Sequence, residues 1–358
     1  MGRRGLDPRG QSRHEHGALK DGFHRVPDAP DVRPTAVKAL VTGGTGFVGS
    51  HLIDSLLNRG DEVTALVRTP AKAAGLADRG VRLVRGDLDS LDALREAAEG
   101  ADVIYHVAGV VAARNDAEFL KANRDGTANL LAAARAAGSP RFVLVSSMAA
   151  AGPAARGVPL VGGEPPRPVT AYGRSKLAGE DIVRSGLLPW VILRPPMVYG
   201  PRDSEVLKLF KMAKWGVAPV FGKGDQELSA IFGPDLAEAL IAAGTSTRSI
   251  GKTYLPCHPE VFTSRAFARQ IGAAVGRDVL VLSVPELVGR GLLAAIGGAA
   301  KLTGTASVLS SEKADEFFEA AWTGSPAALM ADTGWRPSTD IAKGLAETMA
   351  WYRAERWL

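Results

Sequence analysis

Thr42-Gly43-Gly44-Thr45-Gly46-Phe47-Val48-Gly49 is the stretch that decides the fold. An apolar run at 37–41 precedes it, and a helical pattern of apolar residues follows it to about residue 59. Glycines at this spacing permit a tight turn, close backbone approach to a pyrophosphate and close packing of the helix on the strand. The helix N-terminus also offers free N–H groups to a phosphate. The stretch therefore predicts a dinucleotide-binding turn, whose candidate cofactor contacts are Gly43, Thr45, Gly46, Phe47, Val48 and Gly49.

Short apolar strands alternate with helices beyond this turn. Strands are predicted at 62–67, 82–84, 102–107, 141–146 and 190–193, and helices at 91–98, 118–137 and 172–185. This alternation is typical of an α/β protein with a Rossmann-like, doubly wound parallel sheet covered on both faces.

The regular alternation of predicted strands and helices ends after Arg194, where prolines interrupt it. Helices are predicted at 204–214, 235–243, 263–275, 286–300, 309–321 and 340–353. We therefore expect a disordered N-terminal tail at 1–36, an NAD(P)-binding Rossmann domain at 37–194 and a smaller, mostly helical substrate-binding cap at 195–358.

Composition excludes several classes of protein. The 358 residues carry a net charge of +5 without a dense basic run, which argues against nucleic-acid binding. Cys257 is the single cysteine, so no internal disulfide can form, and we expect it to be a packing residue. Three of the six histidines lie in the tail, and no metal site is expected. Without a visible secretory signal or membrane span, the default expectation is a soluble, cytoplasmic protein.

The second predicted strand ends in Arg68, 19 positions after Gly49, with Lys72 nearby. NAD-binding sheets place an acidic residue about 20 positions after the glycines, whereas an arginine can clamp a 2′-phosphate. The sequence therefore favours NADP over NAD, the alternative being a solvated surface arginine. Asp87 follows the third strand and can contact the adenine or cap the helix that begins near Ser90.

Tyr172 and Lys176 lie four residues apart, on one face of a predicted helix. A nearby ammonium favours the phenolate and lowers the pKa of a tyrosine, which makes the phenol a usable acid and base for alcohol–ketone interconversion. Ser147 lies 25 positions before Tyr172, at the carboxyl end of a predicted strand. A hydroxyl there can hydrogen-bond a reacting oxygen. Ser147, Tyr172 and Lys176 are therefore the candidate catalytic residues.

These motifs, together with His106, Asn123 and residues 194–201, resemble the extended short-chain dehydrogenase/reductase family in their order along the chain. The similarity covers roughly 37–355 and points to the epimerase/dehydratase and 3β-hydroxysteroid dehydrogenase-like branches. It implies that Tyr172 is the acid/base, that Lys176 lowers its pKa and holds the nicotinamide ribose, and that Ser147 orients the substrate. It also implies homodimers, often through helices 118–137 and 172–185. Further cofactor contacts implied by the resemblance are Asp87, Leu88, Val107, Ala108, Gly109, Pro195 and Val198, with Asn123 as a structural anchor.

The sequence departs from this family at two places. Nucleotide-sugar members carry an arginine for the substrate diphosphate where this chain has Leu228, although Arg202 and Lys223 are nearby in sequence. Met148 and Ala149 follow Ser147 where dehydratases carry a carboxylate pair, which argues against elimination of water.

Three hypotheses follow for the function. The first is an NADP-dependent oxidoreductase that interconverts an alcohol and a ketone on an apolar, steroid-, terpenoid- or flavonoid-like small molecule. The alternative is a nucleotide-sugar epimerase or reductase, and the third is a dinucleotide-binding protein without turnover. The apolar segment 281–309 can line a substrate pocket, contact a membrane surface peripherally or simply pack as helix.

Overall fold

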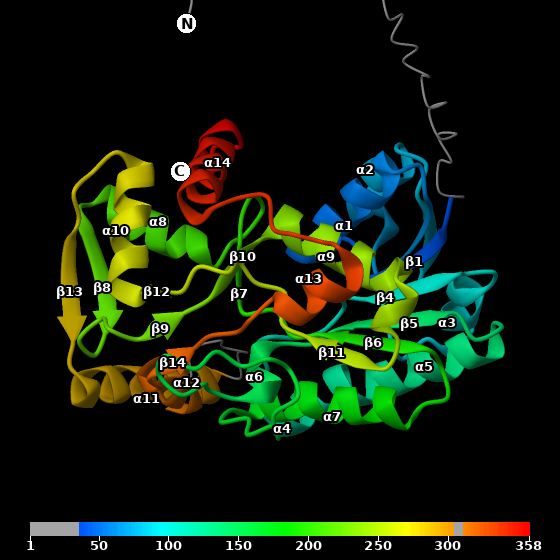
Figure 1. Ribbon diagram of the computed structural model, residues 1–358, viewed down its shortest axis with the longest axis horizontal. Coiled ribbons are helices and arrows are strands. Elements are labelled where there is room, and N and C mark those ends of the chain that lie inside the picture. Colours follow the sequence, from blue (N-terminus) through cyan, green and yellow to red (C-terminus); the bar gives the residue numbers. More distant parts are fainter. Residues whose placement is uncertain (1–35, 304–310) are drawn as a thin grey trace, which may run out of the picture. The chain divides into compact units, whose positions relative to one another are not determined.

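Seven parallel strands form the main sheet in the part of the chain that the structure describes, in the order β11-β6-β5-β4-β1-β2-β3 (Figure 1). The computed structural model describes residues 36–303 and 311–358, and the predicted tail lies almost wholly outside them. Residues Ala36–Leu358 belong to one compact unit. The strands are β1 (Lys38–Thr42), β2 (Glu62–Val67), β3 (Arg82–Arg85), β4 (Val103–His106), β5 (Arg141–Val145), β6 (Trp190–Leu193) and β11 (Lys252–Tyr254). The predicted doubly wound parallel sheet is confirmed.

Alternate side chains of each strand enter apolar clusters on opposite faces of the sheet. Val143 and Leu193 lie in one cluster, and Phe142 and Ile192 lie in the other. Strands that are buried on both faces must be apolar throughout, which is why they read as short continuous apolar runs.

Helices cover both faces (Figure 1). One face packs against α1 (Phe47–Asn58) and α9 (Gly233–Thr245), and the other against α3 (Leu91–Ala98), α5 (Gly126–Ala136) and α7 (Ala171–Ser185). Short helical segments lie between them: α2 (Ala74–Ala77), α6 (Met148–Ala151) and the 3₁₀ turns η1 (Pro70–Ala73) and η3 (Thr247–Ser249).

The single helix predicted at 118–137 is wrong. The structure has α4 (Asp116–Leu120), a π-helical turn η2 (Lys121–Asp125) and then α5. The wide turn carries Asn123, whose side chain is held by hydrogen bonds to Val110 and Ser175. Tertiary contacts of one residue therefore override the regular helical spacing.

Where the structure describes it, the C-terminal part contains the predicted helices and, in addition, three small sheets. The helices are α8 (Val206–Lys214), α10 (Ser264–Val275), α11 (Glu286–Thr303), α12 (Ser311–Phe318), α13 (Ala327–Thr333) and α14 (Ile341–Ala354). The sheets pair β7 (Met197–Tyr199) with β10 (Ala230–Phe232), β8 (Val217–Phe221) with β13 (Leu280–Val284), and β9 (Glu227–Leu228) with β12 (Phe262–Thr263) and β14 (Ala321–Trp322). Residues 233–254 return to the main sheet, because α9 packs against α1 and β11 forms its edge strand. The boundary at residue 194 between a Rossmann domain and a substrate-binding cap stays a prediction.

Among the described residues, no helix has both the length and the apolar character that a bilayer span requires.

Candidate active site

The glycine turn between β1 and α1 has the geometry that a phosphate site needs. Gly43 has φ +74°, and a Cβ on Gly49 would lie 2.2 Å from the carbonyl oxygen of Gly43. The N–H of Gly46 donates to that same oxygen at 3.0 Å. Only glycine fits at 43 without strain and at 49 without a clash. The close helix–strand contact predicted from the sequence is therefore present.

The N-terminus of α1 is open to an anion. No side chain of the described residues caps it, and its first turn contains no acidic residue. By contrast, α7, α10 and α14 are capped by Thr170, Thr263 and Asp340. The residues of this turn therefore fit a pyrophosphate group, whose oxygens would accept from the uncapped N–H groups. Thr45 and Gly46 are exposed at the tip, and Phe47 and Val48 are partly buried behind it.

Arg68 follows β2 directly, and its side chain is exposed. Lys72 is also exposed, in the short turn η1. Asp87 accepts from Ser90 Oγ at 2.7 Å and from the Asp89 N–H at 3.0 Å, and the hydrogen bond from Ser90 holds its pKa below the usual range. Asp87 therefore stabilises the turn that leads into α3.

Leu88 packs beneath the start of α5. A Cβ on Gly126 would lie 2.7 Å from the Leu88 side chain, and the Asn129 amide donates to the Leu88 carbonyl oxygen at 2.9 Å. This residue therefore connects the turn before α3 to α5.

A chain of hydrogen bonds passes through His106 at the end of β4. Nδ1 of His106 lies 2.8 Å from Thr42 Oγ1, and Nε2 lies 3.0 Å from Thr127 Oγ1. Because the Thr127 hydroxyl donates to the carbonyl oxygen of Asn123, Nε2 must be the donor and Nδ1 the acceptor. Thr42 in turn accepts from the Ala108 N–H at 3.2 Å. Burial lowers the pKa of His106 to about 3, so the imidazole is neutral.

Asn123 holds the segment that follows β4 against α7. Its amide donates to the Val110 carbonyl oxygen at 3.1 Å and to Ser175 Oγ at 2.9 Å, and it accepts from the Val110 N–H. A Cβ on Gly109 would lie 2.9 Å from Asn123 Oδ1 and 3.5 Å from Lys176 Nζ. Residues 107–109 thus pass close to both the glycine turn and the lysine.

Ser147, Tyr172 and Lys176 come together at the carboxyl end of β5. The Ser147 side chain lies close enough to the Tyr172 phenol to lower its pKa. Lys176 Nζ donates to the Val145 carbonyl oxygen at 2.8 Å. Ser147 also caps α6 by accepting from the Ala149 N–H, and Thr170 caps α7 two residues before the tyrosine. Two helix N-termini therefore position the two hydroxyls.

The pKa of Tyr172 differs from the sequence expectation. Desolvation raises the pKa of Tyr172 to about 12, and the nearby Ser147 hydroxyl offsets this rise only in part. Burial also lowers the pKa of Lys176 to about 8, although Glu180 opposes this shift. In this structure the ammonium donates to the Val145 carbonyl oxygen, and burial is the larger effect on the phenol.

Sequence reasoning missed a buried ion cluster below these residues. Glu180 accepts from Arg194 at 2.9 and 2.7 Å, from Arg184 at 2.6 Å and from Ser146 at 2.5 Å. These hydrogen bonds, with that from Arg194 largest, hold the pKa of Glu180 low despite its burial. The sequence contained one signal for this cluster, which is the four-residue spacing that puts Glu180 one helical turn after Lys176. These ion pairs and hydrogen bonds hold α7 against the ends of β5 and β6.

Two acidic residues of α12, also missed, lie beside the tyrosine. Glu312 accepts from the Ala171 N–H at 2.5 Å and from Arg174 at 3.0 Å. The charge of Glu316 raises the pKa of Tyr172. Their distance of about 140 residues from the tyrosine in sequence left no local signal.

The remaining predicted positions lie around this centre. Pro195 is buried and its carbonyl oxygen accepts from the Met148 N–H at 2.9 Å, and Val198 lies in β7. Leu228 is partly buried in β9, paired with Phe262 and Trp322. His51 is packed inside α1 with Nε2 2.9 Å from the Pro201 carbonyl oxygen, and Cys257 is a buried thiol, as expected.

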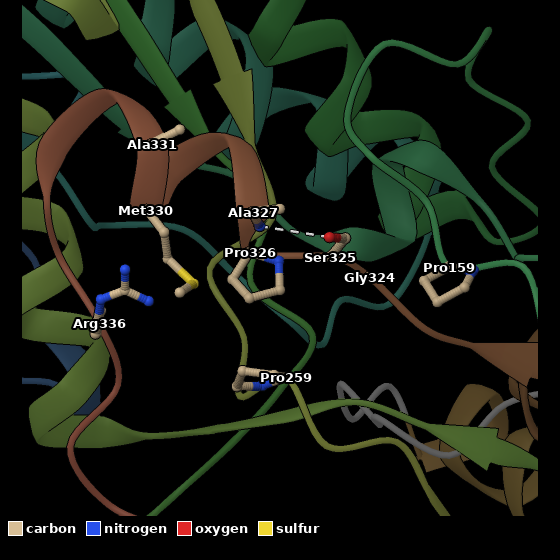
Figure 2. Close-up of a pocket in the computed structure, with 9 residues that line it drawn as sticks. All are labelled: Pro159, Pro259, Gly324, Ser325, Pro326, Ala327, Met330, Ala331 and Arg336. Atoms are coloured by element: carbon tan, nitrogen blue, oxygen red, sulfur yellow. Dashed lines mark hydrogen bonds between the residues drawn. The ribbon is translucent and has the colours of Figure 1, made fainter. Parts of the chain in front are cut away.

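A cavity of about 450 Å³ lies beside the N-terminus of α13 (Figure 2). Figure 2 shows three prolines, Met330 and Arg336 around it. None of the predicted site residues lines it, and sequence reasoning gave it no role.

A family model, described as the NAD dependent epimerase/dehydratase family, matches residues 39–255. The chain is 35% identical over 323 residues to a ceramide reductase of Caulobacter vibrioides, covering 89% of this chain and 95% of that one. It is 29% identical to a 3-beta-hydroxysteroid dehydrogenase of Mycolicibacterium neoaurum, covering 70% and 73%.

Among solved structures, a UDP-glucose 4-epimerase of Thermus thermophilus in complex with NAD superposes with a TM-score of 0.70 at 26% identity, covering 88% of this chain and 99% of that one. The matched region contains the glycine turn, the serine, the tyrosine and the lysine described above. On this evidence of sequence and fold, the chain belongs to the NAD-dependent epimerase/dehydratase family of extended short-chain dehydrogenases/reductases.

Proposed function

We propose that this protein uses NADP to interconvert an alcohol and a ketone on an apolar, lipid-like substrate. The observation that carries the proposal is the grouping of the Ser147 and Tyr172 hydroxyls with the buried ammonium of Lys176 at the carboxyl end of β5. Two adjacent hydroxyls can both donate to one substrate oxygen. The bound nicotinamide supplies the hydride chemistry, and the protein supplies the proton.

Tyr172, Ser147 and Lys176 have distinct roles in the proposed reaction. Tyr172 exchanges a proton with the substrate oxygen, and Ser147 donates a hydrogen bond to that oxygen. Lys176 approaches the phenol when it is released from the Val145 carbonyl oxygen, and its positive charge then lowers the pKa of Tyr172. Lys176 is buried and Tyr172 is partly buried, which limits the access of water to the proton transfer.

An apolar substrate is favoured by Leu228. A leucine in β9 cannot hold a diphosphate, and its neighbours Phe262 and Trp322 are aromatic. The relatives named ceramide reductase and 3-beta-hydroxysteroid dehydrogenase act, by their names, on lipid-like compounds. A nucleotide-sugar epimerase is the second candidate, supported by the likeness to the UDP-glucose 4-epimerase structure.

Turnover of NADPH with a panel of substrates tests the reaction. The panel contains a long-chain β-keto compound, a 3-ketosteroid and UDP-glucose. We expect oxidation of NADPH by an apolar ketone, and an approximately 10²-fold or greater loss of kcat in Tyr172→Phe with unchanged NADPH affinity. Epimerisation of UDP-glucose without net cofactor turnover would instead support the second candidate.

The preference for NADP rests on Arg68, which has no partner among the described residues and is exposed at the end of β2. Arg68→Ser should weaken NADPH binding about tenfold and leave NADH binding unchanged, because only NADPH carries the 2′-phosphate. Arg95→Ser, on the exposed side of α3, is the control. Equal affinity of the wild-type protein for the two cofactors, measured by calorimetry, would contradict the preference.

We also propose a homodimer through α5 and α7. Light scattering on the purified protein measures its mass directly, and a monomer at micromolar concentration would exclude a stable dimer.

A further inference from the structure

Glu180 is a buried carboxylate that has no part in the reaction as proposed above. Its side chain is 0% exposed, and that of its partner Arg194 is 2% exposed. The Arg194 guanidinium donates to Oε1 at 2.9 Å and to Oε2 at 2.7 Å, a two-point contact with a fixed geometry. Ser146 Oγ donates to Oε1 at 2.5 Å, and Arg184 donates to Oε2 at 2.6 Å. Both carboxylate oxygens are therefore bonded from two sides, which holds the side chain in one position.

The strand ends that Glu180 binds continue directly into predicted site residues. Ser146 precedes Ser147 at the end of β5, and Arg194 precedes Pro195 at the end of β6. Strands β5 and β6 are hydrogen-bonded neighbours in the sheet, so one carboxylate on α7 holds both strand ends. A shift of Glu180 would move the strand end that carries the Ser147 hydroxyl. Only one residue thus separates the carboxylate contact from the candidate catalytic serine.

Lys176 lies one helical turn before Glu180, on the same buried side of α7. Its Nζ donates to the Val145 carbonyl oxygen at 2.8 Å, and the next residue of that strand, Ser146, donates to Glu180. Burial lowers the pKa of Lys176 to about 8, and the negative charge of Glu180 opposes that shift. The carboxylate is therefore tied to the lysine by position on the helix, by the shared strand end and by charge.

The other titratable groups beside Lys176 are uncharged. Burial lowers the pKa of His106 to about 3 and raises the pKa of Tyr172 to about 12. The charged residues of α4, η2 and α12, which pack against α7, are engaged in ion pairs of their own, and Arg135 of α5 is exposed. Within the described part of the chain, Glu180 and the two arginines bound to it are thus the charged groups on the buried side of α7.

Stability alone does not explain this cluster. Taking a carboxylate and a guanidinium out of water costs free energy that their attraction recovers only in part. Apolar residues of similar volume often fill such a place without loss of stability. The three elements that the cluster joins all lead into or carry predicted site residues. The cluster therefore points to a role in the site.

We propose that Glu180 is a positioning residue, which places the Ser147 hydroxyl through Ser146 and supports the ammonium of Lys176 by its charge. When the Tyr172 phenol gives its proton to the substrate oxygen, the ammonium stabilises the phenolate that is left. Without the carboxylate, Lys176 loses its own proton at a lower pH, and the phenolate loses that support. This catalytic consequence rests on the proposed function, whereas the effect of Glu180 on Lys176 does not.

Glu180→Gln tests the charge while keeping the size of the side chain and one acceptor oxygen. The titration of Lys176 is followed in the full, cofactor-free chain by NMR of its Cε group, and Lys176→Met, which lacks the signal, assigns it. We expect the titration midpoint of Lys176 to move to lower pH in Glu180→Gln, and to lie closer to the wild type in Glu180→Asp, which keeps the charge. An unchanged midpoint in a folded Glu180→Gln protein overturns the proposal.

The pH profile of kcat with the apolar ketone is the second readout. In Glu180→Gln the alkaline fall in kcat should begin at lower pH, with about a tenfold loss at about pH 8 and a much smaller loss at about pH 6. A purely structural role would lower kcat by the same factor at every pH, and that result would contradict the proposal.

Asp181→Asn is the matched control, because Asp181 is the next residue of α7 and binds the same Arg184 at 3.1 Å, but is 66% exposed. It removes the same charge one position away, and it should keep the wild-type midpoint and pH profile. If it moved the midpoint as far as Glu180→Gln does, the effect would come from the overall charge of the helix, and the proposal would fail.

The double variant Glu180→Met/Arg194→Met guards against misfolding, since the single change leaves Arg194 buried without its ion pair. It removes both charges and should keep a melting temperature near that of the wild type. The midpoint of Lys176 should still move to lower pH. A double variant with the wild-type midpoint and pH profile would show that the site does not need the carboxylate.

Ser146→Ala tests the placement of the serine separately. It should lower kcat several-fold at every pH without moving the alkaline limb, because only the position of Ser147 changes. Unchanged kcat would remove this part of the proposal. Since the NMR titration needs no substrate, it decides the role of Glu180 even if the protein turns over no apolar ketone, so the two proposals fail independently.

Discussion

Lys176 has an unusual setting for a lysine. It lies on the buried side of α7, donates to the Val145 carbonyl oxygen and has the charge of Glu180 one helical turn away. Burial still lowers its pKa from 10.5 to about 8. Burial therefore destabilises the charged form of Lys176. The ribose hydroxyls of a bound cofactor can accept hydrogen bonds from the ammonium, which would offset this destabilisation.

This lowered pKa predicts a pH dependence of stability in the cofactor-free protein. Since the folded pKa lies below the unfolded one, the unfolded chain binds more protons between about pH 8 and 10.5. The Lys176 contribution to the free energy of unfolding should therefore rise by about 2 kcal/mol between about pH 7.5 and 9.5. Urea unfolding of wild type and Lys176→Met measures it. The difference between the two proteins should change with pH, and a constant difference would argue against a buried, titrating ammonium.

At the scale of elements, α1 depends on a contact that a single methyl group would block. A Cβ on Gly49 would lie 2.2 Å from the Gly43 carbonyl oxygen and 2.9 Å from the Cα of Gly44. The backbone of the turn would have to move away from the helix N-terminus. That movement would displace the N–H groups on which phosphate binding depends.

Gly49→Ala should therefore weaken NADPH binding by at least about tenfold and destabilise the fold. Gly75→Ala is the control, because a Cβ there meets nothing within 4 Å and its φ lies outside the left-handed region. This control should leave affinity and stability unchanged or slightly improved. Fluorescence titration with NADPH measures the affinity. Unimpaired binding by the Gly49 variant would show that the turn tolerates the movement.

The π-helical turn shows how one residue can reshape an element. Its Asn123 connects the segment after β4 to Ser175 of α7, while the neighbouring His106 connects β1 to Thr127 of α5. The segment after β4, α7, β1 and α5 are thereby joined without any charged group. A neutral imidazole suits this role, because protonation would leave Nδ1 with no acceptor capacity for Thr42.

At the scale of the whole molecule, α12 comes from a distant part of the chain and packs beside α7, the helix that carries Tyr172 and Lys176. Glu312 accepts from the Ala171 N–H and from Arg174, and Gln226 donates to the Glu316 and Glu319 carbonyl oxygens at the other end of α12. The helix is therefore held at both ends beside Tyr172. An ion pair at one end makes this contact sensitive to charge.

Glu312→Gln should loosen α12 while keeping the size of the side chain. We expect a loss of about 1 kcal/mol in the free energy of unfolding, because charge-assisted hydrogen bonds become neutral ones. KM for the proposed apolar ketone should rise several-fold, with NADPH affinity unchanged, since α12 lies beside Tyr172, the proposed proton donor to the substrate. Asp315→Asn, which breaks the exposed pair with Arg290, is the control. If KM rose equally in Glu312→Gln and Asp315→Asn, the rise would come from the change in charge on α12 and not from the loss of its contact with α7.

The amino-acid sequence by itself determined the sheet and the glycine turn, and it predicted Ser147, Tyr172 and Lys176 as the candidate catalytic residues. Each of these has a local cause: a glycine at a fixed spacing, an apolar run that must be buried on both faces, or a tyrosine and a lysine one helical turn apart. Strand and helix positions in residues 37–194 therefore follow the predictions closely, apart from the turn at 121–125.

Only the tertiary structure decided the surroundings of those residues. The burial that raises the pKa of Tyr172, the cluster around Glu180 and the docking of Glu312 all join segments far apart in sequence. No periodicity records such contacts, because burial and charge depend on which elements the fold brings together. For the same reason, 281–309 allowed three interpretations, and exposure of its described part distinguishes a surface from a packed core.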